Sequence, residues 1–484
     1  MSVILGIDIG TTATKAILLD PQRGLVAEAE RPTALHSDHP GWAEEDVAQW
    51  WDNVVSLCRE LSAGRDIVAI GVSGMVPCVI LQDADGRPIR RSIQQNDARA
   101  VDEIEELRAR LADADVLART GSAITQQSVG PTLLWLQRNE PDAWARTRSI
   151  SGSYDMIVRM LTGERSVESN WALESGLYDL GTDAWAPDIV AASGLDPDCL
   201  PPIRRPHEVV GSVTPGAAAE TGLRPGTPVV AGSADHVASA FSAGLVRAGD
   251  LLVKLGGAGD ILLTTVEPVT DWRLFLDFHL APGRYLPNGC MAASGSFIRW
   301  FQSELACGTS LADLDAEAVA AGPGAGGVVA LPYMLGEKTP IQDPDARGAF
   351  VGLSLATGRG HLFRAVLESV AYGFRHHLDV FAELGQVPGR VRVTNGGARS
   401  ALWKQVTADV LGLPLETLRS HPGSALGAAF VAGMGVGAFT DWDEIERFVE
   451  VGEVVQPRDH DAYDAPYREF RALYPALKAA SGRG

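Results

Sequence analysis

The segment 3–19 constrains the fold more than any other part of this sequence. A β-rich run at 3–9 leads through Gly10-Thr11-Thr12 into a second run at 14–19, and 25–29 can add a third strand. No stretch with helical periodicity lies between these runs. The pattern therefore predicts a β-meander and not a strand–helix–strand unit.

A second segment in the other half of the chain repeats this pattern without repeating the sequence. The run 251–255 enters the turn 256–259, and 261–265 leaves it. A chain of 484 residues is also too long for a single core. We therefore predict two related α/β domains, at 1–245 and 246–484, that pack closely and each offer one phosphate-sized turn toward a shared cleft.

The composition narrows the class of protein. Hydrophobic residues make up 46% and charged residues 21%, which is ordinary for a globular protein, and the net charge of −20 disfavours nucleic-acid binding. Five scattered cysteines without CxxC spacing indicate neither a disulfide framework nor a zinc site. The N-terminus does not resemble a signal peptide, and no uncharged run reaches the ~18 residues of a membrane span. We expect a cytoplasmic protein with no membrane or nucleic-acid partner.

The first turn carries groups suited to phosphate and metal. Gly10 allows close backbone approach, Thr11 and Thr12 add hydroxyl donors, Lys15 adds positive charge, and Asp8 can hold Mg²⁺. The alternative is a hairpin whose turn uses Gly for geometry and Thr for β propensity, and the turn alone favours neither. Neither the Walker A loop nor the GxGxxG fingerprint is present.

Two glycine-containing turns in the second half could approach a nucleotide. Gly256 and Gly257 could lie against a phosphate, and Gly396, Gly397 and Ala398 follow a strand where an adenine ring could lie flat. Each of these sites has the alternative of being a turn and nothing more.

Two polar sites in the first half could serve an acceptor. Asp235 follows a buried strand and could act as a general base toward a hydroxyl, or simply cap the helix after it. Asn96 and Asp97 could bind a polyol, or form a polar loop before the helix expected at 100–111.

Together these segments resemble the FGGY family of carbohydrate kinases over nearly the whole chain. The segments that carry the resemblance are 6–12, 40–46 with Trp50-Trp51, 331–340, and 348–353 followed after seven residues by 361–368. The last pair is the most specific, since it fits the second signature of the family at every defined position. The resemblance implies a two-domain actin/Hsp70/sugar-kinase (ribonuclease H-like) fold with an interdomain cleft.

The resemblance also implies residue roles. Asp235 would be the catalytic base and, with Asp8, would hold Mg²⁺ beside the co-substrate ATP. The acceptor would be bound by Asp235 and the nearby polar and loop residues Val76, Pro77, Asn96, Asp97 and His236. The nucleotide would be bound by the turn residues Gly10, Thr11, Thr12, Lys15, Gly256, Gly257, Gly396, Gly397 and Ala398.

Within the family the chain is most similar to the xylulose kinases, with some departures. Val76 and Pro77 replace the Met-His pair that contacts the sugar in those enzymes, which removes a hydrogen-bonding imidazole. His236 stands where Asn or Gln usually follows the base, and Gly257 and Ala258 replace a Thr-Ser pair of hydroxyls. Thr132 stands where the first signature of the family has Lys.

The leading prediction is ATP-dependent phosphorylation of a terminal hydroxyl of a keto-sugar or polyol, first of all a pentulose. One alternative keeps the fold and changes the acceptor to ribulose, a tetritol or a quorum-signal diol. Another is a catalytically weak, nucleotide-binding regulatory protein. A homodimer is one possible assembly.

Overall fold

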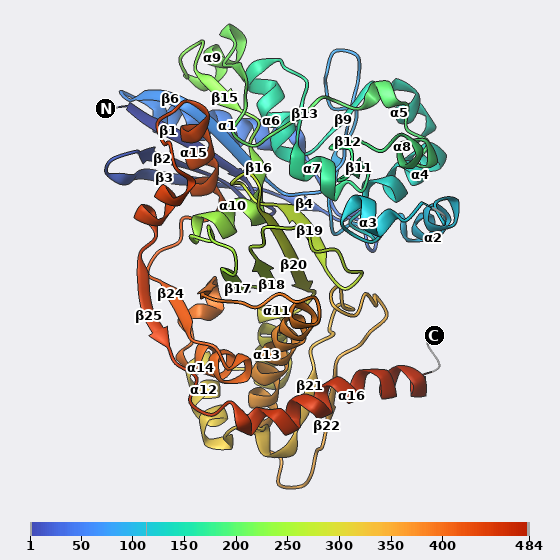
Figure 1. Cartoon of the computed structure of the whole chain (residues 1–484), viewed down its shortest axis with the longest axis vertical. Coiled ribbons are helices and arrows are strands. Elements are labelled where there is room, and N and C mark those ends of the chain that lie inside the picture. The colour runs from blue at the N-terminus through green and yellow to red at the C-terminus, as the bar shows by residue number, and fades with distance from the viewer. Residues whose placement is uncertain (1, 113, 482–484) are drawn as a thin grey trace. The chain divides into compact units, whose positions relative to one another are not determined.

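The computed structural model describes residues 2–112 and 114–481 (Figure 1). The chain divides into two compact units, each built on its own sheet. Unit 1 comprises Met1–Val246, Leu276–Leu286 and Pro422–Val449, and unit 2 comprises Arg247–Phe275, Pro287–His421 and Glu450–Gly484.

The boundary between the units lies close to the one expected after residue 245, but two later segments, Leu276–Leu286 and Pro422–Val449, belong to unit 1. Helix α15 (Ser424–Gly435) explains the second of them, because it packs on strands β1 and β6. A Cβ atom at Gly6 would lie 2.0 Å from the Ala425 carbonyl oxygen, and one at Gly71 equally close to that of Ala428. These glycines let the helix backbone approach the sheet.

The main sheet of unit 1 has the order β14-β15-β6-β1-β2-β3, and β16 also pairs with β6. Strands β1, β2 and β3 run antiparallel to one another, which confirms the predicted β-meander, whereas β1 and β6 are parallel. The strands are β1 (Ser2–Ile9), β2 (Ala13–Asp20), β3 (Gly24–Pro32), β6 (Asp66–Gly74), β14 (Val209–Ser212), β15 (Pro228–Val230) and β16 (Ser233–Ala234).

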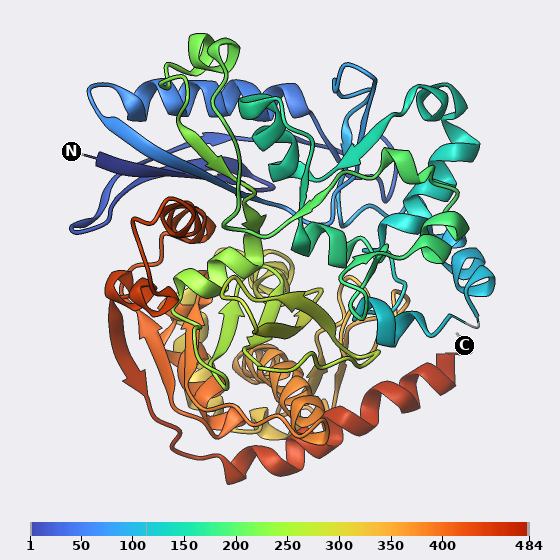
Figure 2. The same ribbon diagram turned by 45° about the horizontal axis from the view of Figure 1, so that its top comes forward.

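Two helices cover the faces of this sheet, α1 (Val47–Ser62) and α15 (Figure 2). Strand β1 is therefore buried on both sides, and its apolar run from Val3 to Leu5 has no exposed surface. Helix α1 begins only at Val47, because Glu44 and Glu45 just before it form the short strand β5. Asp46 caps the helix by accepting a 2.9 Å hydrogen bond from the amide of Ala48.

The rest of unit 1 consists of short helices and strand pairs. Its helices include α2 (Val101–Arg110), α3 (Val116–Thr120), α4 (Val129–Asn139), α5 (Pro141–Arg146), α6 (Ser153–Thr162), α7 (Ser169–Glu174), α8 (Pro187–Ala192), α9 (Pro215–Thr221) and α10 (Asp235–Ser242). Its small strands include β4 (Leu35–His36), β5 (Glu44–Glu45), β7 (Ile80–Gln82), β8 (Ser92–Ile93), β9 (Ser149–Ser151), β10 (Val167–Glu168), β11 (Tyr178–Asp179), β12 (Ala184–Trp185) and β13 (Ile203–Arg204).

The sheet of unit 2 contains the second predicted strand–turn–strand segment. Antiparallel β17 and β18 form it, and β23 and β24 extend the sheet parallel to β17. The strands are β17 (Leu251–Leu255), β18 (Gly259–Leu263), β23 (Val391–Thr394), β24 (Leu415–Leu418) and β25 (Val451–Val455), and the pair β21 (Val329–Leu331) and β22 (Ala349–Val351) stands apart. Strands β19 (Phe275–Phe278) and β20 (Tyr285–Met291) include residues of both units.

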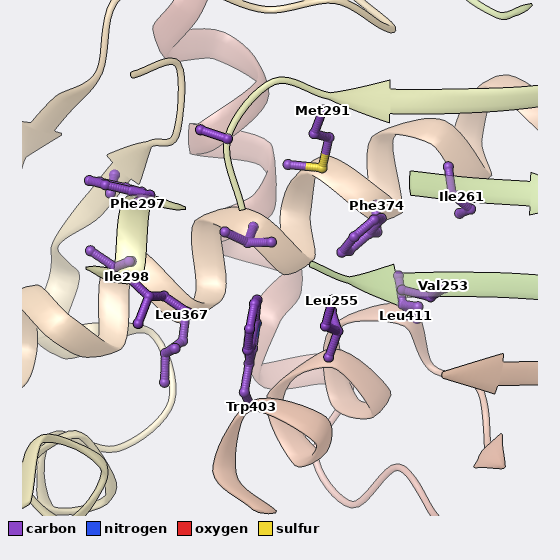
Figure 3. Packing of buried hydrophobic residues seen from close by; sticks show 14 of the residues in the cluster. Val253, Leu255, Ile261, Met291, Phe297, Ile298, Leu367, Phe374, Trp403 and Leu411 are labelled. Atoms are coloured by element: carbon purple, nitrogen blue, oxygen red, sulfur yellow. The ribbon is translucent and has the colours of Figure 1, made fainter. Parts of the chain in front are cut away.

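Helices pack on this sheet to form the core of unit 2 (Figure 3). Phe374 and Trp403 contribute large side chains from two helices, and Leu255 contributes from β17. The helices of the unit are α11 (Gly295–Trp300), α12 (Leu311–Ala321), α13 (Arg359–Glu383), α14 (Ala401–Leu411) and α16 (Asp464–Ser481). Across the described residues, no helix combines the length and apolar character needed to cross a bilayer.

Candidate active site

The first predicted phosphate turn is a tight hairpin in unit 1. The Gly10 amide donates a 3.1 Å hydrogen bond to the Ala13 carbonyl, and a Cβ atom at Gly10 would lie 3.0 Å from the same oxygen. A side chain at this position would therefore crowd the turn. Thr11 lies beside the end of β6, with Oγ1 3.1 Å from Met75 Sδ, and Thr12 is exposed.

Strand register brings Asp8 close to the start of α10. Asp8 and Ser73 are partners across β1 and β6, and Ser73 Oγ donates a 2.9 Å hydrogen bond to Asp8 Oδ1. Ser233 on β16 is the partner of Ser73 on the other side of β6. Asp8 and Asp235, which is two residues beyond Ser233, thus lie at the carboxyl ends of these neighbouring parallel strands.

Helix α10 begins at Asp235, and the side chain of Asp235 does not cap it. Its Oδ1 accepts a 2.5 Å hydrogen bond from the adjacent His236 amide. The capping alternative therefore does not explain the presence of an acid here.

His236 joins Asp235 to two further acids that the sequence did not single out. Its Nε2 lies 2.7 Å from Asp277 Oδ2 and 3.8 Å from Glu174 Oε1, and its Nδ1 lies 3.5 Å from Asp235 Oδ1. An acid within the largely apolar run 274–280 was the available sequence signal for Asp277. Glu174 and Asp277 come from α7 and β19, both within unit 1 for these residues.

These contacts strongly shift the pKa values of His236 and Glu174. Burial lowers the pKa of His236, but Asp277, Glu174 and the hydrogen bonds to Asp235 and Asp277 outweigh it, so the pKa lies well above its ordinary value. Burial raises the pKa of Glu174 well above its ordinary value, and Asp277 adds to this effect. Both shifts favour the protonated form of the group, an imidazolium at His236 and a neutral carboxyl at Glu174.

Val76 and Pro77 follow β6 directly, next to the contact between Met75 and Thr11. Both side chains are buried, and Ser153 Oγ holds this segment through a 2.7 Å hydrogen bond to the Met75 carbonyl. The loop thus presents apolar groups near the first turn.

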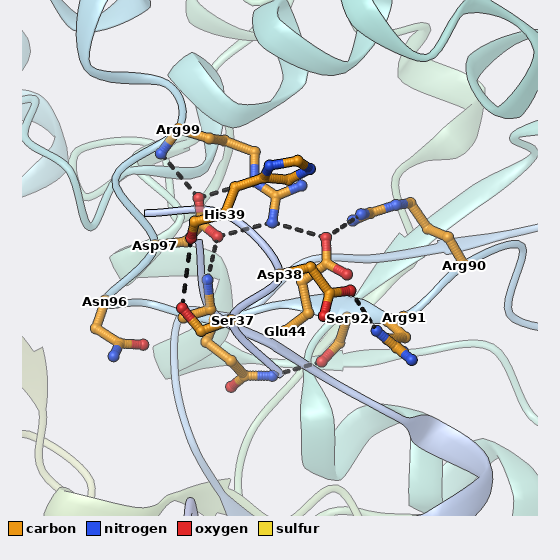
Figure 4. A network of polar contacts seen from close by, with 12 residues as sticks. Ser37, Asp38, His39, Glu44, Arg90, Arg91, Ser92, Asn96, Asp97 and Arg99 are labelled. Atoms are coloured by element: carbon orange, nitrogen blue, oxygen red, sulfur yellow. Dashed lines mark hydrogen bonds and ion pairs between the residues drawn. The ribbon is translucent and has the colours of Figure 1, made fainter. Parts of the chain in front are cut away.

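Asp97 lies in a dense polar network (Figure 4). Its Oδ2 accepts from the Ala43 amide at 2.6 Å and from Arg99 Nη2 at 2.8 Å, and its Oδ1 accepts from Arg99 N and Nε. A carboxylate offers about four acceptor sites. Because these contacts fill them, the direct role of Asp97 toward a sugar stays a prediction, whereas Asn96 beside it is exposed.

The guanidinium of Arg99 holds this network together. It also bonds Glu44 at 2.7 Å, and its Cζ lies 3.8 Å from the Trp42 ring centroid and 5.1 Å from that of Trp135. The loop 96–99 is thereby attached to the segment that contains Trp42.

Lys15 projects from β2 opposite Asp8 in the strand register. Its ammonium lies 3.7 Å from Glu30, with 53% of the Lys15 side chain exposed. Such a pair contributes little to stability, so the lysine can turn to another anion.

The second predicted phosphate turn is held by the start of α11 in unit 2. The carbonyls of Gly256 and Gly257 accept from the amides of Gly295 and Ser294 at 2.8 and 2.9 Å, and Ser296 Oγ also donates to Gly257. A Cβ atom at Gly257 would lie 3.1 Å from Arg299 Nη2. The exposed Arg299, which the sequence did not single out, thus brings positive charge to this turn.

The predicted adenosine turn lies beside the second phosphate turn. Lys254 and Thr394 are partners across β17 and β23, and Asn395 Nδ2 would be 3.0 Å from a Cβ atom at Gly256. Gly397 is required by packing, because its Cβ would lie 2.1 Å from the Trp403 ring. Gly396 faces open space, and Ala398 packs on the core.

The predicted residues thus form two groups. Unit 1 holds the metal and acceptor candidates together with the first turn, and unit 2 holds both glycine turns of the nucleotide candidates. Arg299, Glu174 and Asp277 are additions from the structure.

Known proteins share this architecture over the full chain. A solved xylulose kinase from Rhodospirillum rubrum superposes with a TM-score of 0.94 at 47% identity, covering 99% of this chain and 100% of that one. The xylulose kinases of Escherichia coli (strain K12) and Bacillus subtilis (strain 168) are 31% and 29% identical, covering 98% and 99% of this chain and 99% of each relative.

The fold is therefore that of the two-domain sugar kinases, with the actin/Hsp70-like architecture, and the class is ATP-dependent phosphotransferase. Residues 3–242 match the N-terminal domain and residues 259–436 the C-terminal domain of one family. The chain belongs to the FGGY family of carbohydrate kinases.

Proposed function

We propose that this kinase transfers the γ-phosphoryl group of ATP to a terminal hydroxyl of a pentulose, with D-xylulose as the first acceptor to test. The full-length likeness to proteins named xylulose kinase supports this substrate class. The observation that carries the proposal is the position of Asp235, at the carboxyl end of the same set of strands as Asp8. Asp235 would accept the hydroxyl proton as the phosphoryl group moves.

Mg²⁺ fits the chemistry of the two carboxylates at these strand ends. The carboxylates of Asp8 and Asp235 are oxygen donors of the kind that Mg²⁺ prefers, and Ser73 fixes one oxygen of Asp8. The ion would neutralise phosphate charge when bound. Asp8 and Asp235 would hold it, directly or through water.

Each unit would supply part of the remaining machinery. Thr11, Thr12 and Lys15 would contact phosphates from unit 1, and Gly256, Gly257 and Arg299 from unit 2. Gly396, with open space above its backbone, would lie near the adenosine. A cytoplasmic location and a homodimer belong to the same proposal.

A second acceptor class is favoured by one observation. The buried Val76 and Pro77 present only apolar surface where a hydrogen-bonding pair would discriminate one sugar from another. The acceptor would then be ribulose, a tetritol or a quorum-signal diol.

An acceptor screen separates these possibilities. Purified protein with Mg-ATP is assayed for ADP release on D-xylulose, ribulose, tetritols, hexuloses and a quorum-signal diol. Preference for D-xylulose would support the first proposal, and preference for another acceptor the second. ATP binding without turnover of any acceptor would contradict both and favour a regulatory role.

A further inference from the structure

The contacts of Asp235 within the described chain all fall on one oxygen. Oδ1 accepts from the His236 amide at 2.5 Å and lies 3.5 Å from His236 Nδ1. Oδ2 is then the oxygen left to receive a proton. The direction in which Oδ2 points depends on how firmly His236 holds Oδ1.

The ring of His236 is held from its far side. Nε2 lies 2.7 Å from Asp277 Oδ2, which is a hydrogen bond, and the side chain of Asp277 is only 2% exposed. With one ring nitrogen fixed on Asp277, the other is directed at Asp235.

The backbone next to Asp277 is held by two hydrogen bonds from a neighbouring helix. Asn170 on α7 accepts a 2.8 Å hydrogen bond from the Phe278 amide and donates a 3.1 Å bond to the Phe278 carbonyl. Glu174, on the same helix, lies beside Asp277 and His236, with one polar atom of each within 4.8 Å of the others. The residue after Asp277 is therefore fixed to helix α7.

We propose that Asp277 is a positioning residue for Asp235 and acts through His236. This inference rests on the proposed function, in which Asp235 is the base. The line Asp277–His236–Asp235 would hold the base carboxylate at one angle, so that Oδ2 meets the acceptor hydroxyl. A carboxylate misplaced by about 1 Å lowers turnover by roughly a hundredfold.

The test is a double-mutant cycle with Asp277→Asn, His236→Gln and the double variant. We expect Asp277→Asn to lower kcat about 10- to 100-fold with the KM for ATP unchanged. In the His236→Gln background the same change should alter kcat less than about twofold, because its route to Asp235 is already lost. The matched control is Asp179→Asn, a buried acid paired with Arg119 at 2.7 Å, which should keep wild-type kinetics.

Three kinetic results would overturn the proposal. They are a wild-type kcat in Asp277→Asn, equal effects of that change in both backgrounds, and a loss confined to the KM of the acceptor, which would make Asp277 a sugar ligand. A stoichiometric metal ion in the purified protein that Asp277→Asn removes would likewise overturn it, since Glu174, His236 and Asp277 would then be ligands.

A second variant covers misfolding of Asp277→Asn. Asn170→Ser weakens the two hydrogen bonds to Phe278 and should lower kcat several-fold, and an unchanged kcat there counts against the proposal. The wild type separates the two claims. If it phosphorylates no acceptor, the proposed function fails, whereas an active wild type with an unaffected cycle removes only the positioning role.

Discussion

The guanidinium of Arg299 lies in the space next to Gly257, because a Cβ atom at Gly257 would be 3.1 Å from Arg299 Nη2. The guanidinium stands where a side chain on the turn would otherwise project. Its N–H donors suit a phosphate, and charged hydrogen bonds of this kind contribute about 1.5–3 kcal/mol.

Arg299→Ala should therefore raise the KM for ATP about tenfold and leave the KM for the acceptor unchanged. Adding Gly257→Thr should restore part of the affinity, since its hydroxyl enters the vacated space. Arg347→Ala, an exposed arginine of the same unit, is the control. Unchanged ATP kinetics in Arg299→Ala would remove this residue from the nucleotide site.

Gly396 and Gly397 form a matched pair for the adenosine turn. Gly397→Ala places a methyl group 2.1 Å from the Trp403 ring and should cost about 1–3 kcal/mol in the free energy of unfolding. Gly396→Ala meets no atom within 4 Å, so stability should be unchanged while ATP affinity falls. Calorimetry with ATP and a urea unfolding curve measure both, and full affinity in a stable Gly396→Ala would exclude this turn.

Asp97 is expected to act on stability more than on the acceptor. Asp97→Ala leaves the buried Arg99 with Glu44 as its remaining carboxylate and should cost about 3 kcal/mol in the free energy of unfolding. The control is Asp38→Ala, whose exposed pair with Arg91 in Figure 4 should be worth less than about 1 kcal/mol. A stable Asp97→Ala with a raised acceptor KM would instead make Asp97 a sugar ligand.

Glu337 should make the stability of unit 2 depend on pH. Burial raises its pKa from 4.5 to about 8, although the amides of Ala292 and Lys338 donate to its Oε1. The folded state thus retains a proton that the unfolded chain releases. The stability from this group is fully present below pH 4.5 and is lost as the pH rises through about 8.

Glu337→Gln should therefore weaken the decline in thermal stability between about pH 5 and about pH 9 relative to the wild type. Glu450→Gln changes an exposed carboxylate and should leave the decline as it is. Parallel curves for the wild type and Glu337→Gln would show that Glu337 does not titrate as its burial implies.

The local parts of the fold were predictable from the sequence. Both hairpin turns depend on short runs of strand formers around glycine, and the structure has them where the pattern puts them. The return of α15 to unit 1 was not predictable, because it depends on packing against Gly6 and Gly71, which are distant in the chain. The short strand at Glu44 similarly depends on partners outside its own segment.

The candidate site also contains residues that were predictable from the sequence and residues that were not. Asp8 and Asp235 could be proposed from the sequence because each lies at the end of a recognisable strand, and the register places both at the carboxyl end of neighbouring strands. For Asp277 the only local signal was an acid within an apolar run, and that signal does not reveal its contact with His236. Arg299 contacts Gly257, which is distant in the chain, so no local pattern identifies it. For Asp97, only the three-dimensional structure shows that Arg99 and Ala43 donate to its oxygens.

The most direct test of the account is the rate of acceptor-dependent ADP release by the wild type and by Asp235→Ala, with ATP binding measured in parallel. We predict turnover of a pentulose by the wild type, and a loss of at least about a thousandfold in Asp235→Ala with ATP affinity largely retained. Turnover by Asp235→Ala at the wild-type rate would contradict the assignment of Asp235 as the base.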